Sequence, residues 1–153
     1  MKELIPIINE IAKYGLEPNL IISDKINDLE KNLVKIYALY FDIDYEFDEK
    51  EYADSDIMEM PNIRKNVETN FKEFGFYNTF LDIFKLVEPD NQAIGDAIDD
   101  LADIINDLLV IKWKIENNSL NDGLSFFKFI FHEHTQQHIL DLLNYMKQLE
   151  NRN

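Results

Sequence analysis

Apolar residues recur at spacings of three and four along nearly the whole chain, which is the period of an amphipathic α-helix and not of a strand. The 153 residues contain only four glycines and four prolines. These are too few for the many turns that a sandwich or a barrel needs. We therefore predict an all-α fold: a helical bundle of about five to six helices in a single helical domain over residues 1–153.

Capping and helix-breaking residues divide this pattern into segments. Ser23 is expected to cap a helix, Gly15 and Gly75 to stop one, and Pro89 to close another. The two longest helices lie at the C-terminal end, and we expect them to pack antiparallel. The expected helices run over residues 3–14, about 23–40, 63–75, 80–84, about 92–117 and about 121–149.

The charge balance limits the partners that the chain can have. It has 15 Lys and Arg against 30 Asp and Glu, a formal net charge of −15, and no cysteine. Such a charge repels phosphate backbones and anionic lipids, so we expect no nucleic-acid or membrane partner. No apolar stretch is long enough for a membrane span or a signal core, and we predict a cytoplasmic protein. A basic protein or a metal cation is the favoured partner.

The acids are dense in a connector at about residues 42–60, which we expect to be an exposed loop. Its alternation of acids from Asp42 to Asp48 is similar to a calcium-binding loop. An EF-hand requires glycine at the sixth position and glutamate at the twelfth, where this chain has Phe47 and Ala53. We therefore expect no specific calcium site there.

A second group of acids lies on the helix expected over residues 92–117. At about 100° per residue, its five aspartates fall on one side and the apolar residues on the other. A magnesium site built from several carboxylates is one interpretation of this pattern. The favoured interpretation is a solvent-exposed acidic face, made of Asp96, Asp99, Asp100, Asp103 and Asp107.

All three histidines fall within residues 131–138. His134 and His138 are one helical turn apart and share a face, whereas His132 points away from them. With Asp141, the pair offers nitrogen and oxygen ligands that suit zinc or iron. Both histidines lie on an apolar stripe, which favours neutral core residues over metal ligands. The metal site stays open as the alternative.

The segment Asp100-Leu101-Ala102-Asp103-Ile104 resembles the second acidic motif of the all-α nucleotide pyrophosphohydrolases. That resemblance implies magnesium-dependent hydrolysis of a nucleoside triphosphate between two acidic helices. Asp100 stands where that family has a glutamate. Residues 62–87 also lack the preceding helix with two adjacent glutamates and a third one turn later.

A broader resemblance covers about three quarters of the chain. Residues 75–84, residues 97–108, Trp113 and His138 together resemble a bacterial domain-of-unknown-function family of small acidic helical proteins, frequent in Bacteroides and relatives. Its signature is Leu101-Ala102-Asp103-Ile104. The resemblance implies the fold and a bacterial origin, with no established activity or cofactor, and it makes Asp103 a residue to test. The chain departs from that family at Thr135-Gln136-Gln137, where Trp-Gly is usual.

Three functions follow from these features. The favoured hypothesis is a non-enzymatic protein-interaction module, similar to immunity or antitoxin proteins, that is steered to a basic partner and needs no cofactor. The alternatives are a bundle that binds a divalent metal through His134 and His138, and a magnesium-dependent enzyme similar to the pyrophosphohydrolases. Residues 125–131 are apolar on most sides, so an oligomer is open as well.

Overall fold

The computed structural model describes residues 2–53, 60–85 and 88–152, and most of these residues are helical. A predominantly helical fold is therefore confirmed. The elements in chain order are α1 (Leu4–Leu16), α2 (Lys25–Asp42), α3 (Ile63–Asn70), β1 (Phe76–Phe80), the 3-10 turn η2 (Pro89–Asn91), β2 (Gln92–Asp96), α4 (Ala97–Asn117), α5 (Leu120–Ile130), the π-helical turn η3 (Phe131–Thr135) and α6 (Gln136–Arg152).

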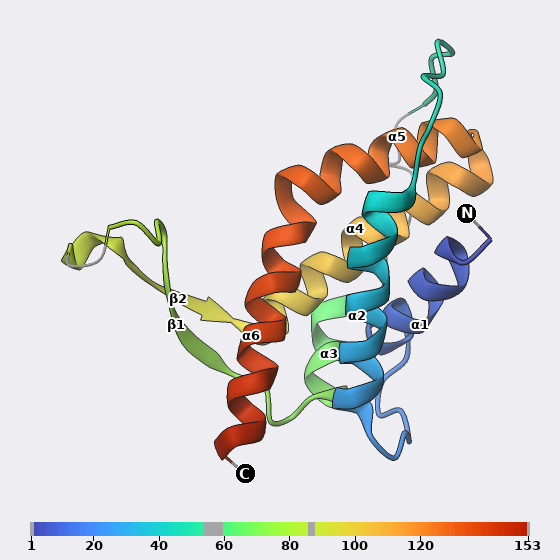
Figure 1. Cartoon of the computed structure of the whole chain (residues 1–153). Helices are drawn as coiled ribbons and strands as arrows, with labels where there is room; N and C mark the ends of the chain where they lie inside the picture. Colours follow the sequence, from blue (N-terminus) through green and yellow to red (C-terminus); the bar gives the residue numbers. More distant parts are fainter. Residues whose placement is uncertain (1, 54–59, 86–87, 153) are drawn as a thin grey trace.

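Helix α4 is the element against which α1, α3, α5 and α6 all pack, and α2 packs against α1 and α6. The apolar stripe of α4 supplies much of the core, including the fully buried Leu101, Ile104 and Leu108. Figure 1 shows these helices gathered into one body, with a hairpin of β1 and β2 projecting from it to one side. The described helices include none that is long and apolar enough to cross a membrane.

The hairpin corrects the expectation of an all-α fold. Strands β1 and β2 pair antiparallel, with Phe76 opposite Asp96 and Phe80 opposite Gln92. Aromatic and β-branched residues in 76–80 favour a strand, and the expected helix over 80–84 does not form. The long helix begins at Ala97 and not near Gln92, because the Asp96 side chain accepts a hydrogen bond from the amide of Ile98 and caps it.

A close approach at the base of the hairpin requires glycine. A Cβ atom at Gly95 would lie 2.2 Å from the ring of Tyr77, on the facing strand. The absence of a side chain lets the Tyr77 ring cross β2 and extend toward α4, where its hydroxyl group donates a hydrogen bond to Asp100. The hairpin therefore contributes a side chain to the polar surface between α4 and α6.

The last helix is not continuous, as the expected segment 121–149 would be. It divides into α5 and α6 at the π-helical turn η3, where the amide of Gln136 donates to the carbonyl oxygen of Phe131, five residues back. Figure 1 shows the chain bending between α5 and α6. Phe131 is fully buried there and stacks on Tyr40 with ring centroids 4.6 Å apart. Single π-helical turns are frequent at functional sites.

Other boundaries differ for local reasons. Helix α1 continues through Gly15 to Leu16, because Gly15 is a buried contact point against Ile63 and not a stop signal. The cap of α2 is Asp24 and not Ser23, and α3 ends at Asn70. Residues 43–53 of the acidic connector form neither helix nor strand, while residues 54–59 of that connector and 86–87 lie outside the described residues.

Candidate metal centre

His134 and His138 lie side by side at the junction of η3 and α6. Their Nε2 atoms are 3.1 Å apart, and the rings meet edge to face. His132 points away and pairs with Glu133 at the surface. The prediction that His134 and His138 share a face is therefore confirmed. Neither is a core residue, because their side chains are 44% and 25% exposed, which corrects the favoured interpretation.

Each of the two histidines is held through its other ring nitrogen by a carboxylate of α4. Nδ1 of His134 is 2.8 Å from Asp107, and Nδ1 of His138 is 2.8 Å from Asp100. A carboxylate at neutral pH only accepts hydrogen bonds, so each Nδ1 carries a hydrogen in the arrangement that satisfies these contacts. Both Nε2 atoms then present a lone pair toward the same point.

The two carboxylates are themselves positioned by further donors. The Thr135 hydroxyl donates to Asp107 over 2.7 Å, and the Tyr77 hydroxyl donates to Asp100. Burial and the contact with Asp100 raise the pKa of Tyr77, so its hydroxyl group keeps its hydrogen. A metal-ligating histidine commonly donates its second ring N–H to a carboxylate that is hydrogen-bonded in turn. Both histidines have that arrangement here.

Two nitrogen atoms 3.1 Å apart, each with its lone pair directed at the other, repel unless a positive charge lies between them. A proton shared by the two rings satisfies them, and so does a metal ion. A tetrahedral zinc ion with Zn–N bonds of about 2.0–2.1 Å holds its two nitrogens about 3.3 Å apart. The hydrogen bond with Asp100 raises the pKa of His138, although burial of the ring opposes this shift. A proton and a metal ion therefore compete for the same nitrogen.

Asp103 supplies a third ligand atom from α4. Its carboxylate Oδ2 is 3.7 Å from Nε2 of His138, and one ligand atom from each of Asp103, His134 and His138 lies within 4.8 Å of the others. Burial raises the pKa of Asp103, yet its side chain remains 39% exposed. Solvent can therefore reach this ligand group.

Asp141, the predicted third ligand, does not belong to this group. Its Oδ1 accepts a hydrogen bond from Gln137 on the outside of α6. Asp141 is seven residues beyond His134, which places it about 10 Å farther along the helix axis. A carboxylate on the facing helix α4 comes closer to both histidines than one farther along their own helix.

The predicted acidic face is not uniformly exposed to solvent. Asp100 is only 7% exposed and Asp107 is half-buried, because α6 packs over this side of α4. Asp96 and Asp99 form ion pairs with Arg64 at 2.8 and 2.7 Å. The helical wheel separates acids from apolar residues correctly, but it gives no sign that histidines of another helix cover the acids.

One signal for the supporting carboxylates was present in the sequence. Asp100, Asp103 and Asp107 follow one another at three and four residues, the spacing of a single helix stripe. His134 and His138 form a shorter stripe, one helical turn long, in a later segment of the chain. Tyr77 and Thr135 carried no such signal, because their partners are distant in the sequence.

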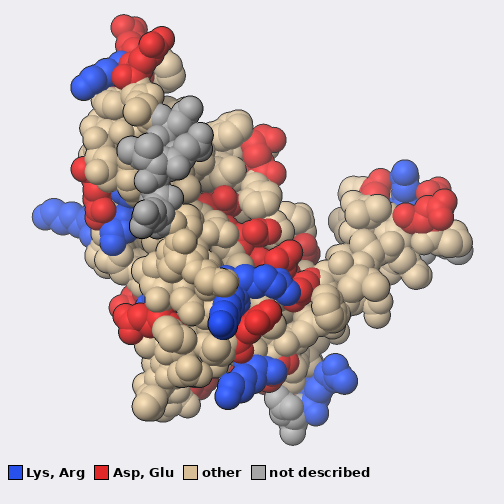
Figure 2. Space-filling model, turned by 180° about the vertical axis from the view of Figure 1, so that it is seen from behind, with Lys and Arg blue, Asp and Glu red and all other residues tan. Residues whose placement is uncertain are grey.

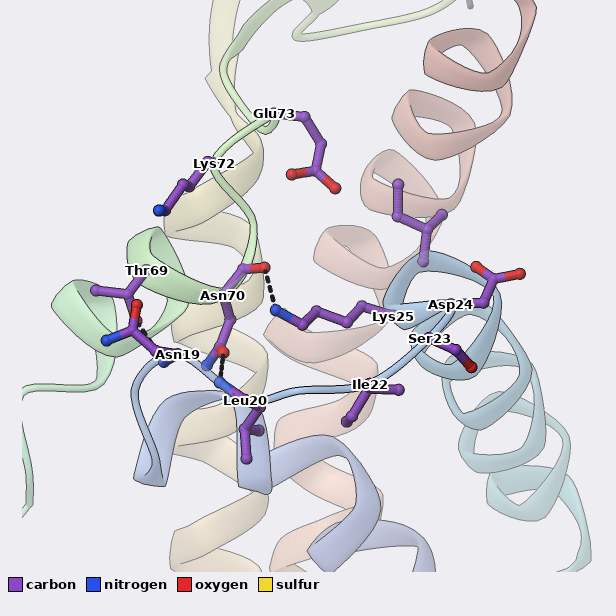
Figure 3. A pocket seen from close by; sticks show the side chains of 11 residues that line it. Asn19, Leu20, Ile22, Ser23, Asp24, Lys25, Thr69, Asn70, Lys72 and Glu73 are labelled. Atoms are coloured by element: carbon purple, nitrogen blue, oxygen red, sulfur yellow. Dashed lines mark hydrogen bonds between the residues drawn. The ribbon is translucent and has the colours of Figure 1, made fainter.

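A surface pocket of about 550 Å³ lies away from the histidines, between the loop after α1 and the end of α3. Figure 3 shows that its polar groups bond to one another: Asn70 accepts from the amide of Leu20, and Lys25 donates to the carbonyl oxygen of Asn70. Asn70 also donates to the carbonyl oxygens of Tyr14 and Glu17. These contacts hold the α1–α2 loop in place, and the pocket contains none of the metal-site residues.

Comparison of the chain with protein-family models, with curated proteins and with solved structures gave no match.

Proposed function

We propose that the chain binds one divalent transition-metal ion through Nε2 of His134, Nε2 of His138 and the carboxylate of Asp103. The observation that carries this proposal is the pair of Nε2 atoms 3.1 Å apart, with both Nδ1 atoms bound to carboxylates. Two imidazoles and a carboxylate are the ligands of many zinc sites and of the non-haem iron(II) centres.

The ligand set also supports a particular chemistry. Three protein ligands leave at least one coordination position for water or a substrate. A metal ion held in this way lowers the pKa of a bound water and polarises a carbonyl or phosphoryl oxygen. The partial exposure of Asp103 and His134 gives that position access to solvent. Imidazole ligands favour zinc or iron over magnesium, which prefers oxygen ligands.

The other functional hypotheses have less support. The interaction module was inferred from the net charge, yet Asp100 and Asp107 bind the histidines, and Asp96 and Asp99 pair with Arg64. A magnesium-dependent pyrophosphohydrolase requires further carboxylates from a second acidic helix. Residues 76–80 form a strand where part of that helix would be. The resemblance to the bacterial domain-of-unknown-function family stays a prediction, and it brings no activity with it.

Elemental analysis and zinc titration of four matched variants test this proposal. We expect the parent chain, purified without chelator, to bind one metal ion, and Asp103→Asn and His134→Gln to lose it. Asp141→Asn and His132→Gln are the controls and should bind as the parent does, since neither side chain belongs to the ligand group. Circular dichroism verifies that each variant is folded.

Two results would contradict the proposal. One is a folded parent that binds neither zinc, iron(II), nickel nor manganese at micromolar concentrations. The other is loss of metal from Asp141→Asn together with retention by Asp103→Asn, which would mean that the ligands come from η3 and α6 without α4.

A further inference from the structure

The hairpin is an arm that extends away from the bundle. We call β1, β2 and the described residues between them the arm. Figure 1 shows it standing clear of the helices along most of its length. It is attached to the helices at its base, where the amide of Gly75 donates to the hydroxyl oxygen of Tyr145 on α6 over 2.9 Å, and where the amide of Ala97 donates to the carbonyl oxygen of Gly75.

The strand register gives the arm two different faces. Phe76, Phe80 and Ile94 lie on one of them, because Ile94 pairs with Asn78 and side chains alternate along each strand. Tyr77 lies on the opposite face and packs against Tyr145 of α6, with ring centroids 5.4 Å apart. The face with the two phenylalanines therefore points away from the bundle, and we call it the free face.

The free face and the tip expose large apolar side chains. Phe76 is 75% exposed, Phe80 54% and Ile94 76%. At about 200 Å² for a whole aromatic side chain, the arm's apolar residues together leave roughly 800 Å² uncovered. This is the area that each partner contributes to a protein–protein interface of standard size. The exposed apolar residues are Phe76, Phe80, Leu81, Ile83, Phe84 and Ile94.

The strands carry a charge only at the base of the arm, where Asp96 ends β2 and pairs with Arg64. Residues 76–81 and 91–95 contain no Asp, Glu, Lys or Arg, although the chain as a whole is 29% charged. Figure 2 shows the arm as mostly uncharged, with acidic and basic side chains gathered at its tip. Sheets that stay unpaired in solution usually carry charges or prolines on their edge strands, which prevent association. Beyond Asp96 at the base of the arm, these strands have neither.

The tip of the arm nevertheless has internal hydrogen bonds that order it. Asn91 is 5% exposed; it accepts a hydrogen bond from the amide of Asp82 and donates to the carbonyl oxygens of Asp82 and Lys85. These bonds order the tip without any contact from a helix. A two-stranded hairpin is marginally stable in water unless a further apolar surface covers it. An ordered but uncovered arm is expected where that cover comes from a second chain.

We propose that the chain forms a two-fold symmetric dimer in which the free faces and the tips of two arms pack against each other. A second copy fits better than a charged partner, because Asp96, the acid on the free face, already pairs with Arg64. Because the charge of Asp96 is balanced by Arg64, two identical free faces do not repel each other, and a two-fold axis brings each face against its copy. The free faces and tips of two arms together offer roughly 1,600 Å² of apolar surface, which is sufficient for a stable dimer.

Sedimentation velocity and light scattering of the full chain, from low to high micromolar concentrations, test this proposal. We expect the parent to be a dimer and Ile94→Lys to be a monomer with the circular dichroism of the parent, since the replaced side chain is exposed. Phe129→Lys is the matched control: Phe129 is 61% exposed on α5, outside the arm, and its variant should stay dimeric.

A parent chain that is monomeric over the whole concentration range overturns the proposal, even if another protein later binds the arm. A dimer that persists in both Ile94→Lys and Phe80→Lys also overturns it, because the interface then lies elsewhere. Metal content does not enter this test, so its outcome is independent of the metal proposal.

Discussion

Replacing Asp100 with asparagine should weaken metal binding while the protein remains folded. The side chain of Asp100 is 9% exposed, and its Oδ1 accepts from Nδ1 of His138 at 2.8 Å. In Asp100→Asn the amide oxygen still accepts from His138, and the amide nitrogen donates to the oxygen of Tyr77. Ring orientation is therefore kept, and the negative charge that makes His138 a stronger ligand is lost.

The expected loss follows from the role of such carboxylates. Removing a partner that orients a histidine ligand typically costs about 10–100-fold in metal affinity, or about 1.4–2.7 kcal/mol. Asp100→Ala should weaken metal binding more than Asp100→Asn does, and it should also destabilise the fold. It leaves the Tyr77 hydroxyl and the His138 Nδ1–H without their acceptor, at about 1–3 kcal/mol of folding free energy for each group that stays buried.

Competition titration against a chromophoric zinc chelator measures the affinity, and urea unfolding of the metal-free variants measures the stability. Asp99→Asn is the control, because Asp99 is the neighbouring residue, its side chain is 61% exposed and its ion pair with Arg64 lies at the surface. A folded Asp100→Asn with parental zinc affinity would refute the reasoning. Equal weakening in Asp99→Asn would attribute the effect to net charge and not to the contact with His138.

Two further predictions concern the fold. Gly123→Ala should lower the free energy of unfolding by about 1–3 kcal/mol. The added Cβ would lie 2.2 Å from a side-chain atom and 2.9 Å from the backbone nitrogen of Ile115. Urea unfolding measures this change, and a higher free energy of unfolding in the variant would contradict the prediction. Burial alone would raise the pKa of Asp28. The hydrogen bonds from Lys13 and Tyr14 lower it by more than burial raises it, so the net pKa lies below the ordinary value of an aspartate. The stability from this carboxylate is therefore present above about pH 4 and is lost as pH falls through the lowered pKa, so Asp28→Asn should differ from the parent in thermal melts at neutral pH and converge with it in acid.

The helices were predictable because their signal is local. The apolar stripe of α4 has the period of a helix, and the residues expected to be buried on it, such as Leu101, Ile105 and Leu108, are buried. The hairpin was not predictable in the same way. Phe80, Leu81, Ile83 and Phe84 have a spacing that also suits a helix, and the strand forms because residues 92–96 pair with residues 76–80.

The candidate site was predictable only in part, for a related reason. The spacing of His134 and His138 placed both rings on one face, and this holds in the structure. The identity of the third ligand depends on how α4 and α6 pack, which no spacing within one helix specifies. Spacing along the histidine helix therefore predicted Asp141, the acid nearest along the same stripe.

Local spacing, composition and charge thus account for the helical character of the chain, its acidity and the histidine pair, because these properties depend on neighbours within one or two turns. The association of Asp100, Asp103 and Asp107 with the histidines, and the exposure of Phe76 and Ile94 on the arm, depend on which surfaces meet in space. Long-range packing places the acidic stripe against imidazoles, partly shielded from solvent, and leaves the apolar side chains of the strands uncovered. By polarity alone, the acidic residues would be expected at the surface and the apolar residues in the core.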